Sequence, residues 1–187
     1  MEQVTEIFDT RQQCFVEALI LDIQERHVRD FEEIWLPQLE ELSEEDKHLD
    51  WALKKRLSRN YDDFEVYALE CNDMAQGFIA IETLGHRSWF DTSASLSADE
   101  TQRIVYAKFI VSAPWNRRVS GTLHYKYVGL KLLLFARQRS LALGYAGRVG
   151  LHSLPGAVGF YHKAGMLELG NDPDRENLTY FEYRGLS

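Results

Sequence analysis

The sequence predicts an α/β fold, and three segments of its C-terminal half carry that prediction. Ile104–Val111 alternates in polarity and is rich in β-branched and aromatic residues, as expected of a strand. Val128–Ala142 has apolar residues at helical spacing and therefore predicts an amphipathic helix. Arg148–His152 predicts a second, short strand. A strand, a helix and a strand in this order indicate a parallel crossover unit.

The N-terminal half predicts a strand, two helices and a hairpin. Cys14–Leu19 is consistent with a strand or with the start of a helix, since periodicity does not separate the two, and we favour the strand. His27–Leu42 and Glu44–Arg59 carry apolar residues along one side and predict two helices. Phe64–Cys71 and Gln76–Thr83 predict a tight hairpin. Neither face of the first hairpin strand is purely polar, so we expect the sheet to be covered on both sides.

The remaining segments are a loop, a short helix and a closing strand. Pro37 falls inside the first predicted helix and should bend or split it. Leu84–Arg103 is a polar stretch, and loops of this length in compact domains are usually functional or disordered. Ala157–Lys163 predicts a short helix, and Leu178–Tyr183 predicts a closing strand.

Composition indicates a single globular domain over residues 1–187. The chain has 187 residues, of which 45% are hydrophobic and 27% charged, an ordinary balance for a soluble protein. Its net charge of −8 argues against nucleic acid or an anionic membrane as partner, because both select basic surfaces. The same charge favours a cationic acceptor such as an amine. Two cysteines and no evident signal peptide or spanning segment predict a cytoplasmic protein.

The start of the predicted long helix suggests an anion-binding site. Gly129 lies in its first turn, near Lys126 and Lys131, with Arg117 and Arg118 upstream. Unpaired N–H groups and the helix dipole favour phosphate at such a position, and glycine allows close approach to the backbone. A glycine that only eases helix packing, beside solvated surface cations, would explain the same residues.

Four short stretches carry a more specific pattern. They are IVSAP (110–114), KYVGLKLL (126–133), GLHS (150–153) and AVGFYHKAGM (157–166). Together they resemble the GNAT superfamily of N-acetyltransferases, over about the C-terminal half of the chain. Two residues depart from the family pattern, because Lys126 stands where Arg or Gln is usual and Lys131 where Gly or Ala is usual. The link from Pro114 to Gly129 is also longer than in the family.

The resemblance implies a GNAT fold, which is a mixed, mostly antiparallel sheet with a splayed central parallel strand pair and helices on both faces. The splayed pair would be Ile104–Val111 and Arg148–His152, and it would admit acetyl-CoA as cosubstrate. In the family, the first of these strands binds the pantetheine arm, and the loop before the helix binds the pyrophosphate. The residues that we expect to bind the cofactor are Phe109, Ile110, Val111, Arg117, Lys126, Tyr127, Val128, Gly129, Leu130 and Lys131.

The resemblance also implies an activity, the transfer of an acetyl group from acetyl-CoA to a primary amine of a small molecule, peptide or protein by direct attack. N–H groups of Phe109 to Val111 would polarise the thioester oxygen. Tyr161 would protonate the leaving thiolate, although a core tyrosine on a short helix is the alternative. A catalytically silent GNAT-fold protein that binds CoA or regulates a partner is the alternative function, and Lys131 and the lengthened loop favour it.

The general base is less well defined by the sequence. We rank Glu82 first, and Glu70, His124, His152 or a chain of water molecules are alternatives. A single carboxylate or histidine is more often a surface or satisfied residue than a catalyst. The sequence contains no nucleophile elbow and no P-loop motif. Its histidines and cysteines also lack zinc-ligand spacing, so no metal is expected. A homodimer is a candidate assembly, and the acceptor is not identified.

Overall fold

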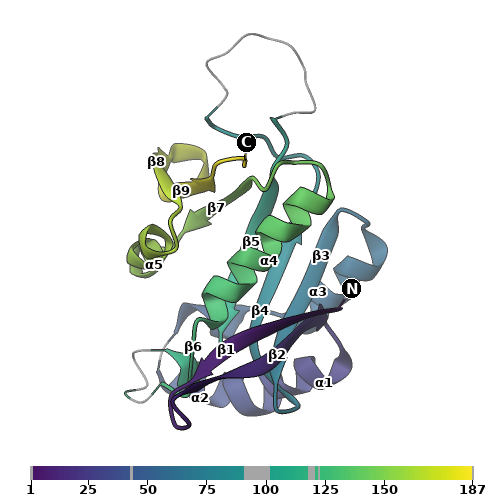
Figure 1. The fold of residues 1–187 in the computed structure, drawn as a ribbon, viewed down its shortest axis with the longest axis vertical. Helices are drawn as coiled ribbons and strands as arrows, with labels where there is room; N and C mark the ends of the chain where they lie inside the picture. Colours follow the sequence, from purple (N-terminus) through teal and green to yellow (C-terminus); the bar gives the residue numbers. More distant parts are fainter. Residues whose placement is uncertain (1, 43, 91–101, 118–120, 122, 187) are drawn as a thin grey trace. The chain divides into compact units, whose positions relative to one another are not determined.

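The computed structural model describes residues 2–42, 44–90, 102–117, 121 and 123–186. Within them the strands form one mixed, mostly antiparallel sheet with the order β6-β1-β2-β3-β4-β5-β7-β9-β8. Its parallel pair is β5 (Val105–Ser112) with β7 (Val149–Ser153). The predicted α/β class and the predicted parallel pair are both confirmed (Figure 1).

The chain divides into two compact units, which we call unit 1 and unit 2. Unit 1 comprises Met1–Ala80 and Phe109–Leu133, and unit 2 comprises Ile81–Lys108 and Leu134–Ser187. β4, β5 and α4 contribute residues to both units. The expectation of a single domain stays a prediction, and each unit is described by itself below.

The strands of unit 1 start with an antiparallel pair, β1 (Glu2–Asp9) and β2 (Cys14–Asp22). The open choice for Cys14–Leu19 is therefore resolved as a strand, whereas β1 was not predicted. β3 (Phe64–Cys71) pairs with β2 and is followed by β4 (Met74–Glu82) after a tight turn, as the hairpin prediction required. The two-residue β6 (Tyr125–Lys126) pairs with the end of β1.

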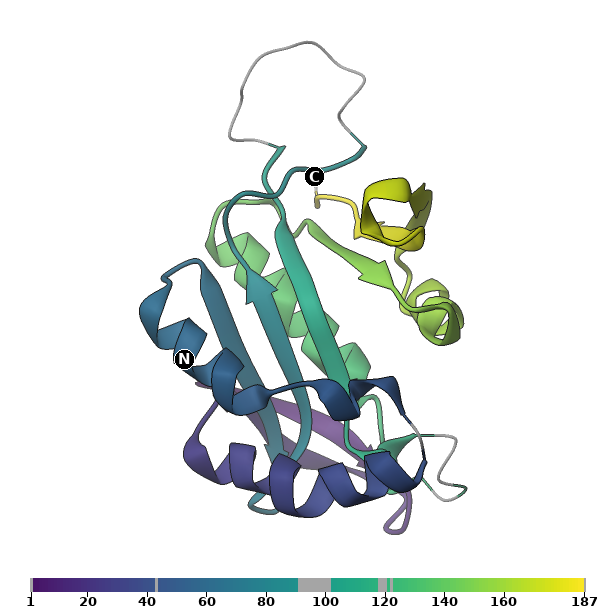
Figure 2. The same ribbon diagram turned by 180° about the vertical axis from the view of Figure 1, so that it is seen from behind.

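Helical segments between residues 25 and 60 cover one face of these strands (Figure 2). They are α1 (Glu25–Arg29), a π-helical stretch (Asp30–Trp35), α2 (Leu36–Glu41) and α3 (Trp51–Asn60). Pro37 does not split the helix. It follows the π-helical stretch at the start of α2, where the change of helix type accommodates a residue without an N–H. The second predicted helix starts later than expected, because a 3₁₀ turn (Glu45–His48) precedes α3.

An aromatic cluster forms the core under these helices. The Phe78 ring of β4 lies 4.7 Å from the Trp35 ring and 4.8 Å from the Trp51 ring. Phe31 packs against both tryptophans. Large aromatic side chains bury much apolar area and dominate such a core, so residues far apart in the sequence fix the helices on β3 and β4.

The start of α4 (Val128–Ala142) covers the other face of unit 1. Gly77 precedes Phe78, so it faces the opposite side of β4. A Cβ at Gly77 would lie 2.6 Å from Cγ1 of Val128 and 2.9 Å from Cδ1 of Leu132. The glycine therefore lets the helix approach the strand closely, and helices on both faces are confirmed.

Unit 2 contains β7, β8 (Leu167–Asp172), β9 (Leu178–Tyr183) and α5 (Val158–Lys163). β9 lies antiparallel between β7 and β8. The register of β5 with β7 has only Val105 opposite Val149 and Tyr106 opposite Gly150. Among the described residues, β7 beyond Gly150 pairs with β9 alone. This short parallel register is what a splayed pair requires.

Two predicted loops fall partly outside the described residues. The parts outside the described residues are 91–101 of the polar stretch and 118–120 and 122 of the link before α4. The expectation for Arg118 therefore also lies outside the described residues. The described ends of the polar stretch meet in an isolated bridge between Arg87 and Arg103. Among the described helices none is long and apolar enough to cross a membrane.

Candidate functional site

The first turn of α4 has free backbone donors. The N–H of Lys131 donates to the carbonyl of Tyr127 at 2.9 Å, which is the first bond of the helix. The N–H groups of Val128, Gly129 and Leu130 precede that bond, and they have no hydrogen-bond partner within the described residues. No acidic side chain lies in this turn. Such a helix start attracts an anion through its N–H groups and its dipole.

The residues before this turn add charge and an exposed aromatic surface. The ammonium group of Lys126 lies 5.5 Å from the centre of the Phe8 ring. Tyr127 stacks on Phe15 with ring centres 6.1 Å apart and an interplanar angle of 13°. Both of these rings are about half exposed, at 49% and 54%. A flat, exposed aromatic surface beside a cation is suited to a nucleotide base.

Arg117 does not join this group of residues. Its guanidinium donates to Asp46 at 2.9 Å, to Glu44 at 3.1 Å and to the carbonyl of Ser112 at 2.8 Å. These contacts tie the end of β5 to the segment before α3. Because the guanidinium is already satisfied by carboxylates, it has little remaining capacity for a phosphate. The structure thus shows Arg117 bound to Asp46, Glu44 and Ser112, and its cofactor role stays a prediction.

The two ends of β5 direct their N–H groups to opposite neighbouring strands. The N–H of Val105 donates to Arg148 at 3.2 Å, toward β7, whereas the N–H of Ala113 donates to Gln76 at 2.9 Å, toward β4. In a regular strand, N–H groups eight residues apart point to the same side. The alternation is therefore interrupted once between Val105 and Ala113, as it is at a bulge. The predicted oxyanion donors lie within this interval.

Tyr161 lies on α5 and is almost buried, with 8% of its surface exposed. Its ring packs against Phe181, with ring centres 5.6 Å apart. The phenol oxygen has no hydrogen-bond partner among the described residues. Burial, and to a lesser extent Tyr106, raises the pKa of Tyr161 to about 12. The phenol thus keeps its proton and is free to donate it.

Glu82 is bound by His86 and by Lys108. His86 donates to it at 2.7 Å and Lys108 at 2.6 Å. The His86 bond, together with Lys108, lowers the pKa of Glu82 to about 2 against the opposing effect of burial. A carboxylate with so low a pKa is a weak base. The general-base role predicted for Glu82 therefore finds no support in its surroundings.

The alternative carboxylate Glu70 is also committed to partners. It accepts from Arg26 at 2.7 Å and from the buried His27 at 2.7 Å. Burial alone would raise the pKa of Glu70, but the bonds from Arg26 and His27 outweigh it and lower the pKa. His124, another alternative, lies in unit 1 beside the guanidinium of Arg11.

A cluster that the sequence did not assemble lies in unit 2. The hydroxyl of Tyr106 is 2.8 Å from Nδ1 of His152, and Nε2 of the same ring is 2.9 Å from a carboxylate oxygen of Asp172. His152 was named as an alternative base, but neither partner was. Burial lowers the pKa of His152, although Asp172 opposes this. The neutral imidazole is thereby favoured.

This cluster borders a pocket of about 380 Å³, which we call the Tyr106 pocket. A pocket of this size is within the usual range for small ligands. Its walls include the rings of His86, Trp89 and Tyr180. The Trp89 ring stacks on the Tyr180 ring at 4.2 Å, and the Tyr180 hydroxyl leaves room for no side chain at Gly150.

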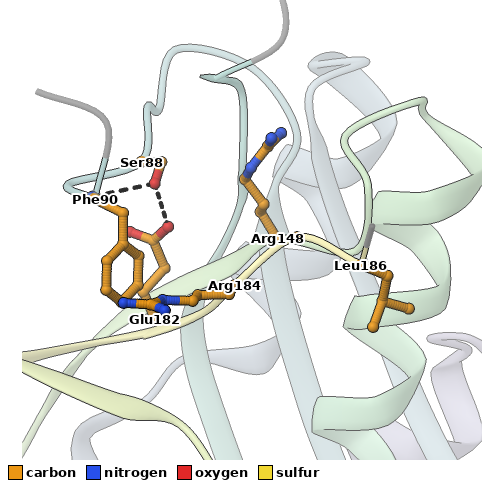
Figure 3. Close-up of a pocket in the computed structure, with 7 residues that line it drawn as sticks. Ser88, Phe90, Arg148, Glu182, Arg184 and Leu186 are labelled. Atoms are coloured by element: carbon orange, nitrogen blue, oxygen red, sulfur yellow. Dashed lines mark hydrogen bonds between the residues drawn. The ribbon is translucent and has the colours of Figure 1, made fainter. Parts of the chain in front are cut away.

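A second hollow of unit 2, of about 400 Å³, surrounds a buried carboxylate (Figure 3). Glu182 is fully buried and accepts hydrogen bonds from the Ser88 hydroxyl, from the N–H of Trp89 at 2.9 Å and from the Tyr180 hydroxyl at 3.2 Å. The Arg184 guanidinium lies against the Phe90 ring at 4.5 Å. The carboxylate is satisfied internally, so this hollow has the character of a structural network.

The predicted site residues separate between the units. All ten expected cofactor-binding residues lie in unit 1, whereas Tyr161 and Glu82 lie in unit 2. Lys126, Tyr127 and the first turn of α4 are brought together, and Arg117 is directed elsewhere. Tyr106 and Asp172 were missed because nothing in their local sequence marks them. Only the register of β5 with β7 and of β8 with β9 places them on either side of His152.

This strand order, with one short parallel pair, is that of the GNAT fold, and comparison with solved structures confirms that the protein has it. The PaiA N-acetyltransferase of Thermoplasma acidophilum, solved with coenzyme A, is 13% identical, and the match covers 90% of this chain and 99% of that chain with a TM-score of 0.60. A GNAT-family acetyltransferase from Listeria monocytogenes is 14% identical, with 97% and 100% coverage and a TM-score of 0.56.

The same comparison also matches a structure described as a bacterial toxin, at 16% identity over 68% of this chain and 70% of that chain, with a TM-score of 0.50. No family model matches the sequence, and no curated protein matches it. Similarity at these identities extends to the fold, and a fold can carry several functions. The function must therefore be argued from the site.

Proposed function

We propose that the protein is an acetyl-CoA-dependent N-acetyltransferase that acts on a primary amine of a small molecule or a peptide. The observation that carries this proposal is the first turn of α4, with its free N–H groups and no acidic side chain. The GNAT fold and a solved relative in fold that contains coenzyme A support it.

The residues present fit the diphosphate of a CoA thioester. N–H groups of Val128, Gly129 and Leu130 would hold it, and Lys126 and Lys131 would add charge. Neither lysine has an ion-pair partner among the described residues. The stacked rings of Phe15 and Tyr127 offer a surface for the base. When bound, acetyl-CoA supplies the thioester whose carbonyl carbon the amine attacks.

Two further groups have roles in this proposal. N–H groups of Phe109–Val111, which lie in the interval of β5 where the N–H alternation is interrupted, would stabilise negative charge on the carbonyl oxygen, as donors aimed at a developing oxyanion do. Tyr161 would donate its proton to the departing sulfur and recover it from solvent. Its free hydroxyl and its raised pKa of about 12 are consistent with a donor that stays protonated at neutral pH.

Two measurements test the proposal. Titration calorimetry with acetyl-CoA measures binding, and release of the CoA thiol over a panel of amines measures turnover. We expect saturable binding and thiol release with at least one amine. Binding without release for every amine would favour the catalytically silent CoA-binding or regulatory protein, whereas absence of binding would contradict both functions.

The other expectations stay predictions. They are a cytoplasmic location, no nucleic-acid or membrane partner, and a homodimer as candidate assembly. Ultracentrifugation would measure the last.

A further inference from the structure

We propose that the Tyr106 pocket binds the amine acceptor, that Tyr106 and His152 remove its proton, and that Asp172 positions His152. The inference rests on the proposed acetyltransferase function and deepens it, since it assigns the general base and the class of acceptor. All the residues involved lie in unit 2, as does Tyr161.

The hydrogen bonds determine the tautomer of His152. A carboxylate can only accept, so Nε2 carries the hydrogen that is directed at Asp172, 2.9 Å away. Nδ1 then carries a lone pair and accepts a hydrogen bond from the Tyr106 hydroxyl at 2.8 Å. The other carboxylate oxygen of Asp172 accepts from the N–H of Asp174 at 3.0 Å, which fixes the carboxylate in place. The imidazole is thus orientated as in base dyads in which a carboxylate holds the ring.

The Tyr106 ring is held as firmly as the imidazole. His86 stacks on it, with ring centres 4.4 Å apart and an interplanar angle of 16°. His86 is in turn bound to Glu82, and Glu82 to Lys108. This arrangement gives Glu82 a positioning role, because its two partners hold the ring that buttresses Tyr106. Tyr106 lines the pocket, and its phenol oxygen interacts with the backbone N–H of His152, so an amine would bond to the second lone pair of that oxygen.

The proton transfer that follows is balanced. As the amine nitrogen bonds to the acyl carbon, it becomes positively charged and acidic, and its proton passes to the oxygen of Tyr106. The phenol proton passes to Nδ1 of His152 at the same time, so the tyrosine ends neutral and the imidazole becomes a cation beside Asp172. The imidazolium then loses its proton to solvent. No group is oxidised or reduced.

The charges at the pocket favour an acceptor that also carries a carboxylate. Arg87 and Arg175 line it, and neither has an ion-pair partner among the described residues. Asp172, the acidic residue of the lining, is already bound to His152. Among the described lining residues, a diamine or polyamine would find no free carboxylate. An amino acid or small peptide would place its carboxylate near the arginines and its amine near Tyr106, against aromatic walls. The net charge of the chain favoured a cationic acceptor, whereas the two arginines at the pocket favour an acceptor with an anionic group.

Nuclear magnetic resonance titration of labelled histidine tests the dyad without any cosubstrate. His152→Gln identifies the His152 signal by its loss. We expect Tyr106→Phe to raise the pKa of His152, since it removes a donor to the neutral form, and Asp172→Asn to lower it, each by roughly 0.5–1 pH unit. The charged and titratable groups that face the ring are Tyr106, Asp172, Arg175, His86 and Tyr180. No movement in either variant would overturn the dyad.

Steady-state kinetics test the chemical role. We expect Tyr106→Phe and His152→Gln each to lower kcat roughly 100-fold, and Asp172→Asn to lower it about tenfold and to displace the acidic limb of the pH–rate profile. Affinity for acetyl-CoA, from calorimetry, should stay unchanged in all three. Tyr183→Phe is the matched control, because this buried phenol bonds to the carbonyl of Ala164 outside the pocket. A Tyr106→Phe protein that turns over like the control would contradict the proposal.

An acceptor panel tests the substrate class. We expect amino acids to exceed their carboxamides in kcat/KM by about tenfold, and Arg175→Gln to abolish that preference. Equal use of carboxamides or diamines would contradict the carboxylate assignment. If the wild type releases thiol and the turnover of Tyr106→Phe and His152→Gln is unchanged, the inference fails and the acetyltransferase function stands. If no amine is used, the proposed function fails, and the histidine titration still decides the dyad.

Discussion

Each unit contains a histidine paired with a carboxylate, and the two pairs differ in what completes them. In unit 1, Nε2 of His27 donates to Glu70 at 2.7 Å, and Nδ1 accepts from the N–H of Gln24 at 3.1 Å. In unit 2, Nε2 of His152 donates to Asp172, and Nδ1 accepts from the Tyr106 hydroxyl. Burial lowers the pKa of both histidines. The chemistry of the two pairs is therefore the same.

The difference lies in the last member of each chain of hydrogen bonds. His27 is wholly buried, and its network ends on the N–H of Gln24, where the bond caps the start of α1. The network of His152 ends on a phenol that borders a pocket. A shifted pKa alone would rank the two histidines equally as candidates. The two differ in access to a ligand, which depends on the residues around the pair. His152 has that access and is a candidate base, whereas His27 has a structural role.

The largest expected effect lies in unit 2 and concerns Tyr161. Tyr161→Phe should lower kcat by roughly 100-fold, because the departing sulfur loses its proton donor. The ring and its packing on Phe181 remain, so stability should change little. Stopped thiol-release assays measure the rate, and calorimetry should give an unchanged Kd for acetyl-CoA. Unaltered turnover would remove Tyr161 from the mechanism.

A second effect concerns the packing of α4 in unit 1. Gly77→Ala should destabilise the protein by about 1–3 kcal/mol, because the new methyl group would overlap Val128 and Leu132. It should also weaken acetyl-CoA binding, since the helix start must move. Denaturant titration and calorimetry measure the two quantities. Gly156→Ala is the control, because a Cβ there meets nothing within 4 Å. Equal stability of both variants would contradict the close contact.

The pair in unit 1 should affect stability and leave chemistry alone. His27→Gln should cost roughly 1–3 kcal/mol, because it disrupts the buried bonds to Glu70 and Gln24. The turnover of the folded fraction should match that of the wild type. Chemical denaturation and active-site titration with acetyl-CoA give both numbers. A loss of turnover per folded molecule would erase the distinction between the two histidines.

The same pair makes stability depend on pH. The pKa of His27 is lowered from its ordinary 6.5, mainly by burial. As pH falls below 6.5 toward the folded value, the unfolded state binds a proton that the folded state does not, so the free energy of unfolding decreases. Denaturation between pH 7 and 5 should show this decrease in the wild type, and a smaller one in His27→Gln. An identical slope in both would assign the decrease to other groups.

The smallest effect distinguishes two cations that the sequence had grouped together. Lys126→Ala should weaken acetyl-CoA binding by about three- to tenfold, and less so at high salt, because the lysine is exposed. Arg117→Gln should leave that affinity unchanged and lower the melting temperature, because it breaks contacts with Glu44, Asp46 and Ser112. Calorimetry at two salt concentrations separates them. Weaker binding in Arg117→Gln alone would restore Arg117 to the phosphate site.

Elements with apolar runs or helical spacing bounded by turn residues were predicted well, because burial on one or both faces selects such residues. β5, α4, β7 and the β3–β4 hairpin are examples. β1 was missed because it shows only partly buried or exposed residues over most of its length, and such a strand has a weak hydrophobic signal. α3 was assigned too many residues, because acidic and leucine-rich segments read as helix even where the chain forms a 3₁₀ turn.

What this sequence determines by itself is local, namely the strand–helix–strand crossover, the glycine in the first turn of α4, and the segment around Tyr161 that resembles an acetyltransferase. Burial and hydrogen bonding along a single element leave a periodic trace, so these features can be read without coordinates. Tertiary structure alone decided that Arg117 contacts Glu44 and Asp46, that His86 and Lys108 bind Glu82, and that Tyr106, His152 and Asp172 form one chain of hydrogen bonds. Those facts depend on strand register and on charges brought together from distant positions, and both act through space with no trace in local pattern.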